Sequence, residues 1–387
     1  MKVEINIDRI RYLLTYYNLS EEDLLSVLNE GRKRLCSHND IFSPEVELPI
    51  LKKIEAYFKC GMTFFYDFTP LSTEQNQSIF FRKQLFESEP NMETRRIVFQ
   101  FEKLKTQLDA YASLSDNRIN VYQKSYSLED DPQIVANKVR KDFYPAMRIK
   151  NQREFLKEFI NKCSEHGVYV FEFVENWNKK EKANVDGICV MPNMIILKHQ
   201  QWYKREIFTL AHELGHFLLH EENLNTVDID SKKIFSRSDS QVENWCHEFA
   251  FRFIVGDAIQ KIDSEEYLDS SNDYGWAIIR SIADYTHIST IALYTHCLYA
   301  NKVSLPDYEN IYKEHLEKVD AEKKRKESVA VGEGEKKKNF ARTAKPIISK
   351  LFMESMQYAF FKGVINEPTF CSQLKITSAE AEGKYLW

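Results

Sequence analysis

The sequence predicts an α+β protein that is mainly helical. Three observations predict this class. Apolar residues recur at helical spacing over most of the chain. Three short runs rich in β-branched and aromatic residues lie between residues 168 and 199, as expected of a small sheet. The composition, 43% hydrophobic and 29% charged over 387 residues, is that of a folded globular chain. At this length two or three domains are expected.

Residues 1–72 are expected to form a small helical domain. The stretch IDRIRYLLTYYN has helical spacing, and LSEEDLLSVLNEG follows it with Ser20 as N-cap, Asp23 at the third helical position and Gly31 as the stop. Two short amphipathic helices joined by a tight turn fit a helix-turn-helix. Helical bundles that do not contact DNA have the same pattern, so both interpretations stay open.

The rest of the chain divides into five predicted segments. Residues 73–128 are expected to be a helical connector. Residues 129–262 contain the three strand-like runs, VYVFEF, VDGICVM and MIILKH, together with two amphipathic helices, and form the predicted core domain. Residues 263–316 are helical and again fit a helix-turn-helix pair. A polar, charged run at 317–338 is expected to be a linker, and 339–387 a C-terminal helical segment.

Charge and apolar patterning exclude several classes of protein. The net charge of −5 gives the whole molecule no basic field for nucleic acid, and residues 1–60 carry nine Lys/Arg against ten Asp/Glu. No run approaches 18 apolar residues, and the first residues lack the apolar run of a signal peptide. Seven scattered cysteines without a CxxC pair indicate reduced thiols. We therefore expect a cytoplasmic protein with no membrane partner.

A metal-binding pattern lies in FTLAHELGHFLLH, residues 208–220. Residues four apart share one face of a helix, so His212 and His216 present two imidazoles to one point, with Glu213 beside them. This is HExxH, in which two histidines hold Zn²⁺ and the glutamate is the general base. Gly215 is expected to permit a close backbone approach. An apolar stripe is expected to face the core and to leave the histidines on a wet face that opens into a cleft: Ile207, Leu210, Ala211, Leu214, Phe217 and Leu218. The alternative is a surface helix that carries His and Glu by coincidence.

A catalytic zinc needs a third protein ligand and leaves its fourth position open. His220 lies eight residues after His212, about 12 Å along the helix axis, which is too far to share one ion. We expect His220 near the helix end or behind the ligands.

The better third donor is Glu243, in the downstream helix SQVENWCHEFAFRFIVG. Glu243 and His247, four residues apart, lie together along the edge of an apolar stripe. The members of that stripe are Val242, Trp245, Cys246, Phe249, Ala250 and Phe253. Two alternatives stay open at this point: Glu248 is a competing carboxylate, and Glu243 could be an ordinary exposed side chain.

FTLAHELGHFLLH followed by ENWCHEFAFRFIVG resembles the ImmA/IrrE metallopeptidase family, whose usual form is FTLAHELGH, then ExxANxFA with a closing Met-Pro. The glutamate that opens the second motif is the family's third zinc ligand, and it falls on Glu243. The sequence departs from the pattern in three places. Cys246 stands for the usual Ala, His247 for the usual Asn, and Gly256-Asp257 lies near the usual Met-Pro. The first two could alter the surroundings of Glu243, but none removes a ligand.

The resemblance is strong over residues 130–260 and looser over 1–300. It implies a zincin-like core, in which a small sheet packs on the HExxH helix and on a second, Glu-bearing helix, flanked by helical N- and C-terminal regions. It also implies an Xre-type helix-turn-helix region before the peptidase. In this family the peptidase typically cleaves a helix-turn-helix repressor and so regulates mobile-element or stress genes. Some members are found beside Xre-like antitoxins.

The leading hypothesis is therefore a zinc endopeptidase of the gluzincin type. His212, His216 and Glu243 would hold Zn²⁺, and Glu213 would take a proton from water and pass it to the leaving amine. A donor for the tetrahedral oxyanion is also expected. The candidates for that donor are Tyr203, His220 and His247.

Two other functions remain open. One is a transcriptional regulator that binds DNA or a repressor and holds a non-catalytic zinc, with the N-terminal region as the DNA-binding part. The retained Glu213 disfavours it, because a structural zinc site has no use for a free carboxylate beside its ligands. The other is the toxin half of a two-gene module, for which the chemistry would be the same. The expected partner is a protein substrate, an Xre-type repressor, and the expected cofactor is Zn²⁺.

Overall fold

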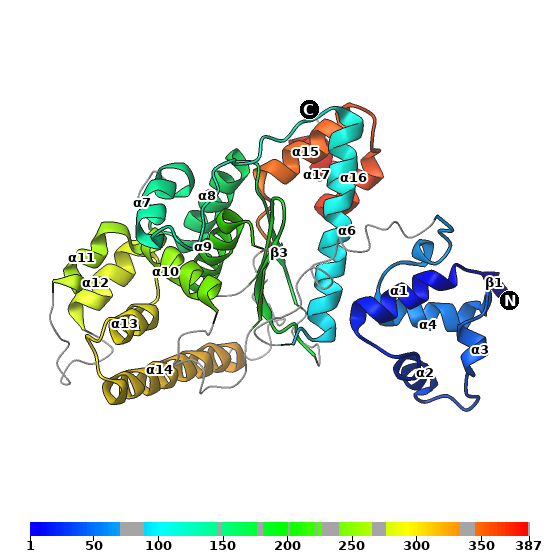
Figure 1. The fold of residues 1–387 in the computed structure, drawn as a ribbon, viewed down its shortest axis with the longest axis horizontal. Coiled ribbons are helices and arrows are strands. Elements are labelled where there is room, and N and C mark those ends of the chain that lie inside the picture. Colours follow the sequence, from blue (N-terminus) through cyan, green and yellow to red (C-terminus); the bar gives the residue numbers. More distant parts are fainter. Residues whose placement is uncertain are drawn as a thin grey trace. The chain divides into compact units, whose positions relative to one another are not determined.

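The computed structural model of the chain (Figure 1) describes residues 1–69, 89–145, 149–175, 181–199, 202–221, 223–226, 240–264, 276–332 and 345–385. The chain folds into two compact units. The first comprises Met1–Ala110, Asn176–Val185 and Leu224–Val227, and the second comprises Tyr111–Glu175, Asp186–Asn223 and Asp228–Trp387.

The first unit is a small helical domain with one two-stranded sheet. Its described elements are β1 (Lys2–Glu4), α1 (Ile7–Tyr17), α2 (Glu21–Asn29), α3 (His38–Ile41), β2 (Glu45–Glu47), α4 (Leu48–Phe58), the 3₁₀ helix η1 (Met62–Phe64) and α6 (Met92–Ser115) as far as Ala110. Apolar side chains from α1, α2 and α4 form its core, which also includes Phe65 and Phe99.

Local sequence signals set the ends of α2. The Ser20 hydroxyl accepts a hydrogen bond from the Asp23 N–H, and the Asp23 carboxylate accepts one from the Ser20 N–H at 2.8 Å. This capping box satisfies N–H groups that have no partner inside the helix. Gly31, just beyond the helix, has the positive φ of +68° for which glycine is favoured. These features confirm the predicted start and stop of this helix.

The second unit contains most of the helices and the larger sheet. Its described elements are α7 (Pro132–Phe143), α8 (Gln152–Glu165), β3 (Tyr169–Phe173), β4 (Val185–Val190), β5 (Met194–Lys198), α9 (Tyr203–Leu219), β6 (Asn223–Thr226), α10 (Gln241–Val255), the 3₁₀ helix η4 (Gly256–Ile259), α11 (Gln260–Asp263), α12 (Ala277–Thr286), α13 (Thr290–Tyr299), α14 (Leu305–Gly332), α15 (Lys350–Phe361), α16 (Glu367–Leu374) and α17 (Ser378–Lys384). The first residue of β4 and most of β6 fall in the ranges of the first unit.

The larger sheet has the strand order β3-β5-β4-β6. Strands β3 and β5 are parallel, with Tyr169 opposite Met194, whereas β4 and β5 are antiparallel, with Gly187 opposite Leu197. β3, β4 and β5 are the three apolar runs that the sequence predicts as strands. The prediction of a mainly helical α+β chain with a small sheet is confirmed.

Alternate residues of the sheet contact different helices, as the two-residue period of a strand requires. The residues of one face belong to the core that also contains α8, α9 and α10: Val170, Cys189, Ile195 and Leu197. On the other face, Tyr169 Oη and Ser355 Oγ of α15 are hydrogen-bonded at 2.8 Å. Phe171 packs edge-on against Phe352, with ring centroids 5.0 Å apart. Helix α15 is therefore packed on the peripheral strand β3.

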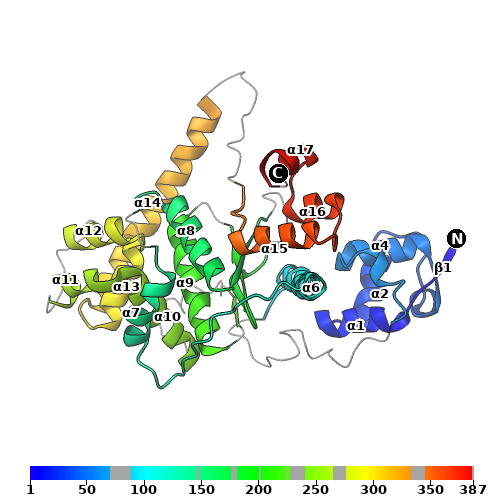
Figure 2. The same ribbon diagram turned by 90° about the horizontal axis from the view of Figure 1, so that it is seen from above.

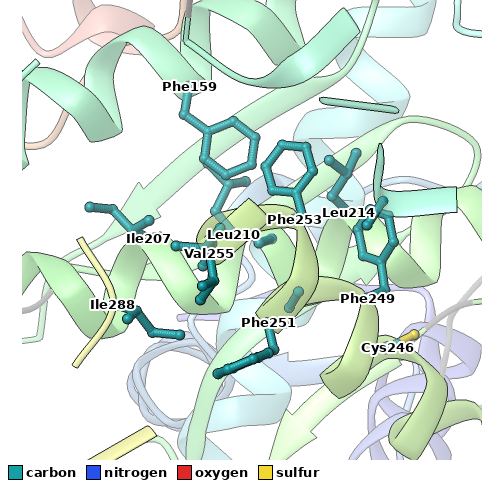
Figure 3. Close-up of a cluster of buried hydrophobic side chains, with 14 of the residues drawn as sticks. Phe159, Ile207, Leu210, Leu214, Cys246, Phe249, Phe251, Phe253, Val255 and Ile288 are labelled. Atoms are coloured by element: carbon teal, nitrogen blue, oxygen red, sulfur yellow. The ribbon is translucent and has the colours of Figure 1, made fainter. Parts of the chain in front are cut away.

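Helices α9 and α10 pack against each other over most of their length. Figure 3 shows the apolar side chains between them. The α9 side chains labelled there are Ile207, Leu210 and Leu214, and those of α10 include Cys246, Phe249 and Phe253. The two apolar stripes expected from the sequence are buried in one core, apart from the partly buried Val242.

The charged run expected as a linker at 317–338 has regular structure in its described part. Residues 317–332 continue α14, which begins beside α13 and runs on as one long helix (Figure 2). The run is rich in Glu and Lys, which are good helix formers, and Lys318 pairs with Glu314 one turn before it at 2.5 Å. Residues 333–338 lie outside the described part of the chain, as does 73–88 of the expected connector.

Two global expectations can be compared with the described residues. All seven cysteines are buried and lie outside any disulfide, in keeping with the reduced thiols expected from the sequence. Among the described helices, none is both long and apolar enough to cross a bilayer.

Candidate metal centre

Helix α9 carries three of the predicted site residues. His212, Glu213 and His216 all lie in its C-terminal half, on turns whose apolar residues pack into the core. The helix ends at His220, whose φ of +56° is left-handed and whose N–H donates to the Phe217 carbonyl at 3.1 Å. The buried apolar stripe thus determines which side of α9 the HExxH residues occupy.

Helix α10 brings Glu243 to the histidines. The Ser240 side chain caps its first turn by accepting from the Glu243 N–H at 3.3 Å, and Trp245 Nε1 donates to the Asp130 carbonyl at 2.7 Å. A Cβ on Gly215 of α9 would lie 3.2 Å from Cys246 Sγ, closer than nearly all such contacts. Gly215 therefore permits the close approach of the two helices that the sequence predicted.

The potential ligand atoms of three side chains converge between α9 and α10. His212 Nε2 lies 3.1 Å from Glu243 Oε2 and 3.1 Å from His216 Nε2, and His216 Nε2 lies 3.4 Å from Glu243 Oε1. Ligand atoms bound tetrahedrally to one zinc at about 2.0–2.1 Å would lie about 3.3 Å apart. The three side chains therefore have the chemistry and the spacing of a site for a divalent metal ion.

The site is buried, which corrects one expectation. His212 is 1% exposed, and Glu213 and His216 are 0% exposed, so the histidine side of α9 is not the wet face expected from the sequence. The reason is that α10 packs closely on this side of α9 and Gly187 of β4 abuts Glu213. Two carboxylates and two imidazoles taken out of water favour a divalent cation among them.

The electrostatics of Glu243 fit a ligand role. Burial alone would raise the pKa of this carboxyl group. The hydrogen bonds and the electrostatic interactions with His212 and His216 outweigh that effect and hold the pKa well below its ordinary value. Glu243 is therefore ionised at neutral pH and can act as an anionic oxygen donor.

The carboxylate of Glu213 occupies a space left by a glycine. A Cβ on Gly187 of β4 would lie 2.5 Å from Glu213 Oε1 and 2.6 Å from Thr209 Cγ2, distances that Cβ atoms essentially never show. Only a residue without a side chain fits there. Gly187 was not predicted as a site residue, although a glycine inside an apolar strand is a recognised signal of close approach by another group.

His247 borders the same centre. One of its ring nitrogens belongs to a set of potential ligand atoms, with one from His212 and one from Glu243, that all lie within 4.8 Å of one another. Its ring packs nearly perpendicular to that of His212, with centroids 4.8 Å apart. Unlike the other site residues it is exposed.

The remaining candidates lie farther from this point. Tyr203 is the first residue of α9, nine residues before His212 and thus about 13 Å away along the helix. His220 is exposed at the other end, where its ring packs parallel to Phe217. Glu248, the competing carboxylate, accepts a hydrogen bond from Arg252 Nε at 2.6 Å.

A second buried polar cluster was not predicted from the sequence. His199 Nδ1 lies 3.0 Å from Glu172 Oε1 of β3 and 3.7 Å from Glu206 Oε1 in the first turn of α9. The other oxygen of Glu172 accepts a hydrogen bond from the Ile347 N–H. The only sequence signal was a glutamate within the apolar run VYVFEF.

Comparison with known proteins agrees with the location of this centre. Residues 163–296 match the model of the M78 peptidase family, described as the IrrE N-terminal-like domain. The matched segment contains both α9 and α10, and the match indicates a metallopeptidase-like function. No curated protein and no solved structure matches the chain significantly.

Proposed function

We propose that this protein is a zinc-dependent endopeptidase in which His212, His216 and Glu243 hold the metal ion and Glu213 is the general base. The observation that carries the proposal is the convergence of two imidazole nitrogens and one carboxylate, 3.1–3.4 Å apart, in a buried position. The match of residues 163–296 to a peptidase family supports the same chemistry.

A divalent ion held by these side chains would polarise the scissile carbonyl and lower the pKa of a water molecule. Glu213 adjoins His212 in α9, and its carboxylate is fixed between α9 and Gly187. It would accept the proton from the attacking water and then pass it to the amine of the leaving peptide. Because Glu213 is fully buried, its side chain is pre-positioned for this transfer.

The proposed substrate is a helix-turn-helix protein, an Xre-type repressor or an antitoxin-like partner. The support is the resemblance of the sequence to a family that cleaves such repressors. Cleavage would then regulate stress or mobile-element genes.

A regulator with a non-catalytic zinc is the second candidate. Structural zinc sites are usually closed by four Cys or His ligands, whereas the tight triangle of atoms here contains two His and one Glu, with Glu213 adjacent. Nor does the charge of residues 1–60, with nine basic and ten acidic side chains, favour DNA binding by that region. These two observations favour the peptidase.

The proposal is tested by the isosteric change Glu213→Gln. Wild type and variant are loaded with zinc and incubated with a random peptide library and with candidate Xre-type repressors, and the products are identified by mass spectrometry. We expect equal zinc content and cleavage by the wild type alone. Cleavage by Glu213→Gln at the wild-type rate would show that Glu213 is not the base.

A further inference from the structure

The position of His247 in the structure indicates a role beyond those expected from the sequence. It lies four residues after Glu243, so the two side chains leave the same face of α10 one turn apart. A ring nitrogen of His247 lies within 4.8 Å of ligand atoms of both His212 and Glu243. The centre thus has a fourth potential donor beside the triangle of His212, His216 and Glu243.

We propose that His247 is a conditional fourth ligand, which closes the metal centre when it turns inward and opens it when it turns outward. This inference rests on the proposed function, since it concerns the zinc held by the other three side chains. Its consequence is regulation: a centre with four protein ligands has no position for water or substrate, and a centre with three has one.

The distances favour a ligand that binds the metal ion in one side-chain conformation and releases it in another. Ligands of one tetrahedral zinc lie about 3.3 Å apart. The set of atoms within 4.8 Å of one another includes ligand atoms of His212 and Glu243 but not of His216. For His212 and Glu243, this upper bound on the distance from His247 exceeds the tetrahedral spacing by at most about 1.5 Å (4.8 − 3.3). Rotation about the side-chain bonds of an exposed histidine covers such a distance without movement of the helix.

The type of residue supports the same role. At this position the pattern that the sequence resembles has asparagine, whose amide is a poor zinc ligand. Imidazole is among the preferred ligands of zinc. The ring of His247 also packs against Phe208, with centroids 5.7 Å apart, so it has an apolar neighbour besides the His212 ring. Neighbouring Glu248 is paired with Arg252, which leaves His247 as the nearer donor on this turn of α10.

The experiment compares the full-length wild type with His247→Ala and His247→Asn. The zinc dissociation constant is measured by competition with a chelator, and the affinity of zinc-loaded protein for acetohydroxamate, a small chelating probe of open zinc positions, is measured by calorimetry. His38→Ala, which removes an exposed histidine of the first unit, is the matched control.

Loss of a fourth ligand should weaken zinc binding at least ~10-fold in both His247 variants and tighten acetohydroxamate binding several-fold. The control should match the wild type in both. Equal zinc affinity in wild type and His247→Ala would overturn the fourth-ligand proposal while leaving the peptidase proposal intact. So would a loss of peptide cleavage with unchanged zinc affinity, because that is the signature of an oxyanion donor. A wild type that binds no zinc would overturn both proposals.

Discussion

At the scale of single residues, the metal centre depends on Gly187, a residue without a side chain. Gly187 leaves the space that Glu213 Oε1 occupies, so Gly187→Ala should displace the carboxylate. We expect cleavage to fall at least ~10-fold, because small misplacements of a catalytic group are costly. Overpacking should also lower the free energy of unfolding by about 1–3 kcal/mol. Cleavage is measured as kcat/KM on a cleaved peptide, and the free energy of unfolding is measured by urea denaturation.

The control for this substitution is Gly383→Ala in α17, where a Cβ would meet nothing within 4 Å. It should be neutral or slightly stabilising, since alanine is the better helix former. If Gly187→Ala behaved like Gly383→Ala in both measurements, the proposed fit between Gly187 and Glu213 would be wrong.

The cluster of Glu172, His199 and Glu206 predicts how stability depends on pH. Burial, followed by the interaction with Glu172, raises the pKa of Glu206 to about 8. Hydrogen bonds to Glu172 and Glu206 raise the pKa of His199 to about 10. In the folded state both groups keep their proton up to a higher pH than they do in the unfolded state. Stability should therefore fall as pH rises from 6 to 9, by on the order of 1 kcal/mol or more.

The measurement is the urea midpoint of zinc-loaded protein at pH 6, 7, 8 and 9. Glu206→Gln removes one titrating group but keeps a hydrogen-bonding side chain of similar size, so its midpoint should change less over this range. A steeper dependence in Glu206→Gln than in the wild type would contradict the interpretation.

At the scale of elements, α10 is fixed at its C-terminal end by Arg140 of α7. The Arg140 guanidinium donates to the carbonyls of Phe253 and Ile254, and its carbon lies 3.7 Å from the centre of the Tyr144 ring. Arg140→Ala would remove these contacts, and we expect a loss of about 1–3 kcal/mol in the free energy of unfolding. Lys141→Ala, at the exposed next position, is the control. Equal urea midpoints for the two variants would exclude this role for Arg140.

The elements differ in how well the sequence predicted them. The helices α9 and α10 were predicted because each has a helical period of apolar residues, and the strands β3, β4 and β5 because each is a short apolar run rich in β-branched and aromatic residues. The pair β1 and β2 was not, because three-residue strands separated by about 40 residues carry no such period. The long α14 was expected in part as a linker, because a charged run rich in helix formers can be either.

The same distinction applies to the centre. His212 and His216 are four residues apart in one helix, so local spacing brings them together. Glu243 was predicted from its position at the edge of an apolar stripe and from a family resemblance. Local spacing could not predict it, because sequence alone does not give the packing of two helices. Gly187 and the cluster around His199 join segments whose contacts follow only from the tertiary fold.

At the scale of the whole molecule, all the proposed ligands belong to the second compact unit. Zinc should therefore stabilise that unit, by about 4 kcal/mol at a free concentration 1,000 times the dissociation constant. Hydrogen exchange read by mass spectrometry, with and without a chelator, tests this. Exchange should rise in α9 and α10 when zinc is removed and stay unchanged in α1 and α4. An equal rise in both units would contradict the assignment of the metal to the second.

The most direct test of the metal centre compares two carboxylates of the same helix. Zinc binding is measured by chelator competition for wild type, Glu243→Gln and Glu248→Gln. We predict one tightly held zinc per chain in the wild type and in Glu248→Gln. In Glu243→Gln the affinity should fall by more than the ~10–100-fold typical of losing an outer-shell partner. Zinc held as tightly by Glu243→Gln as by the wild type would contradict the proposed centre.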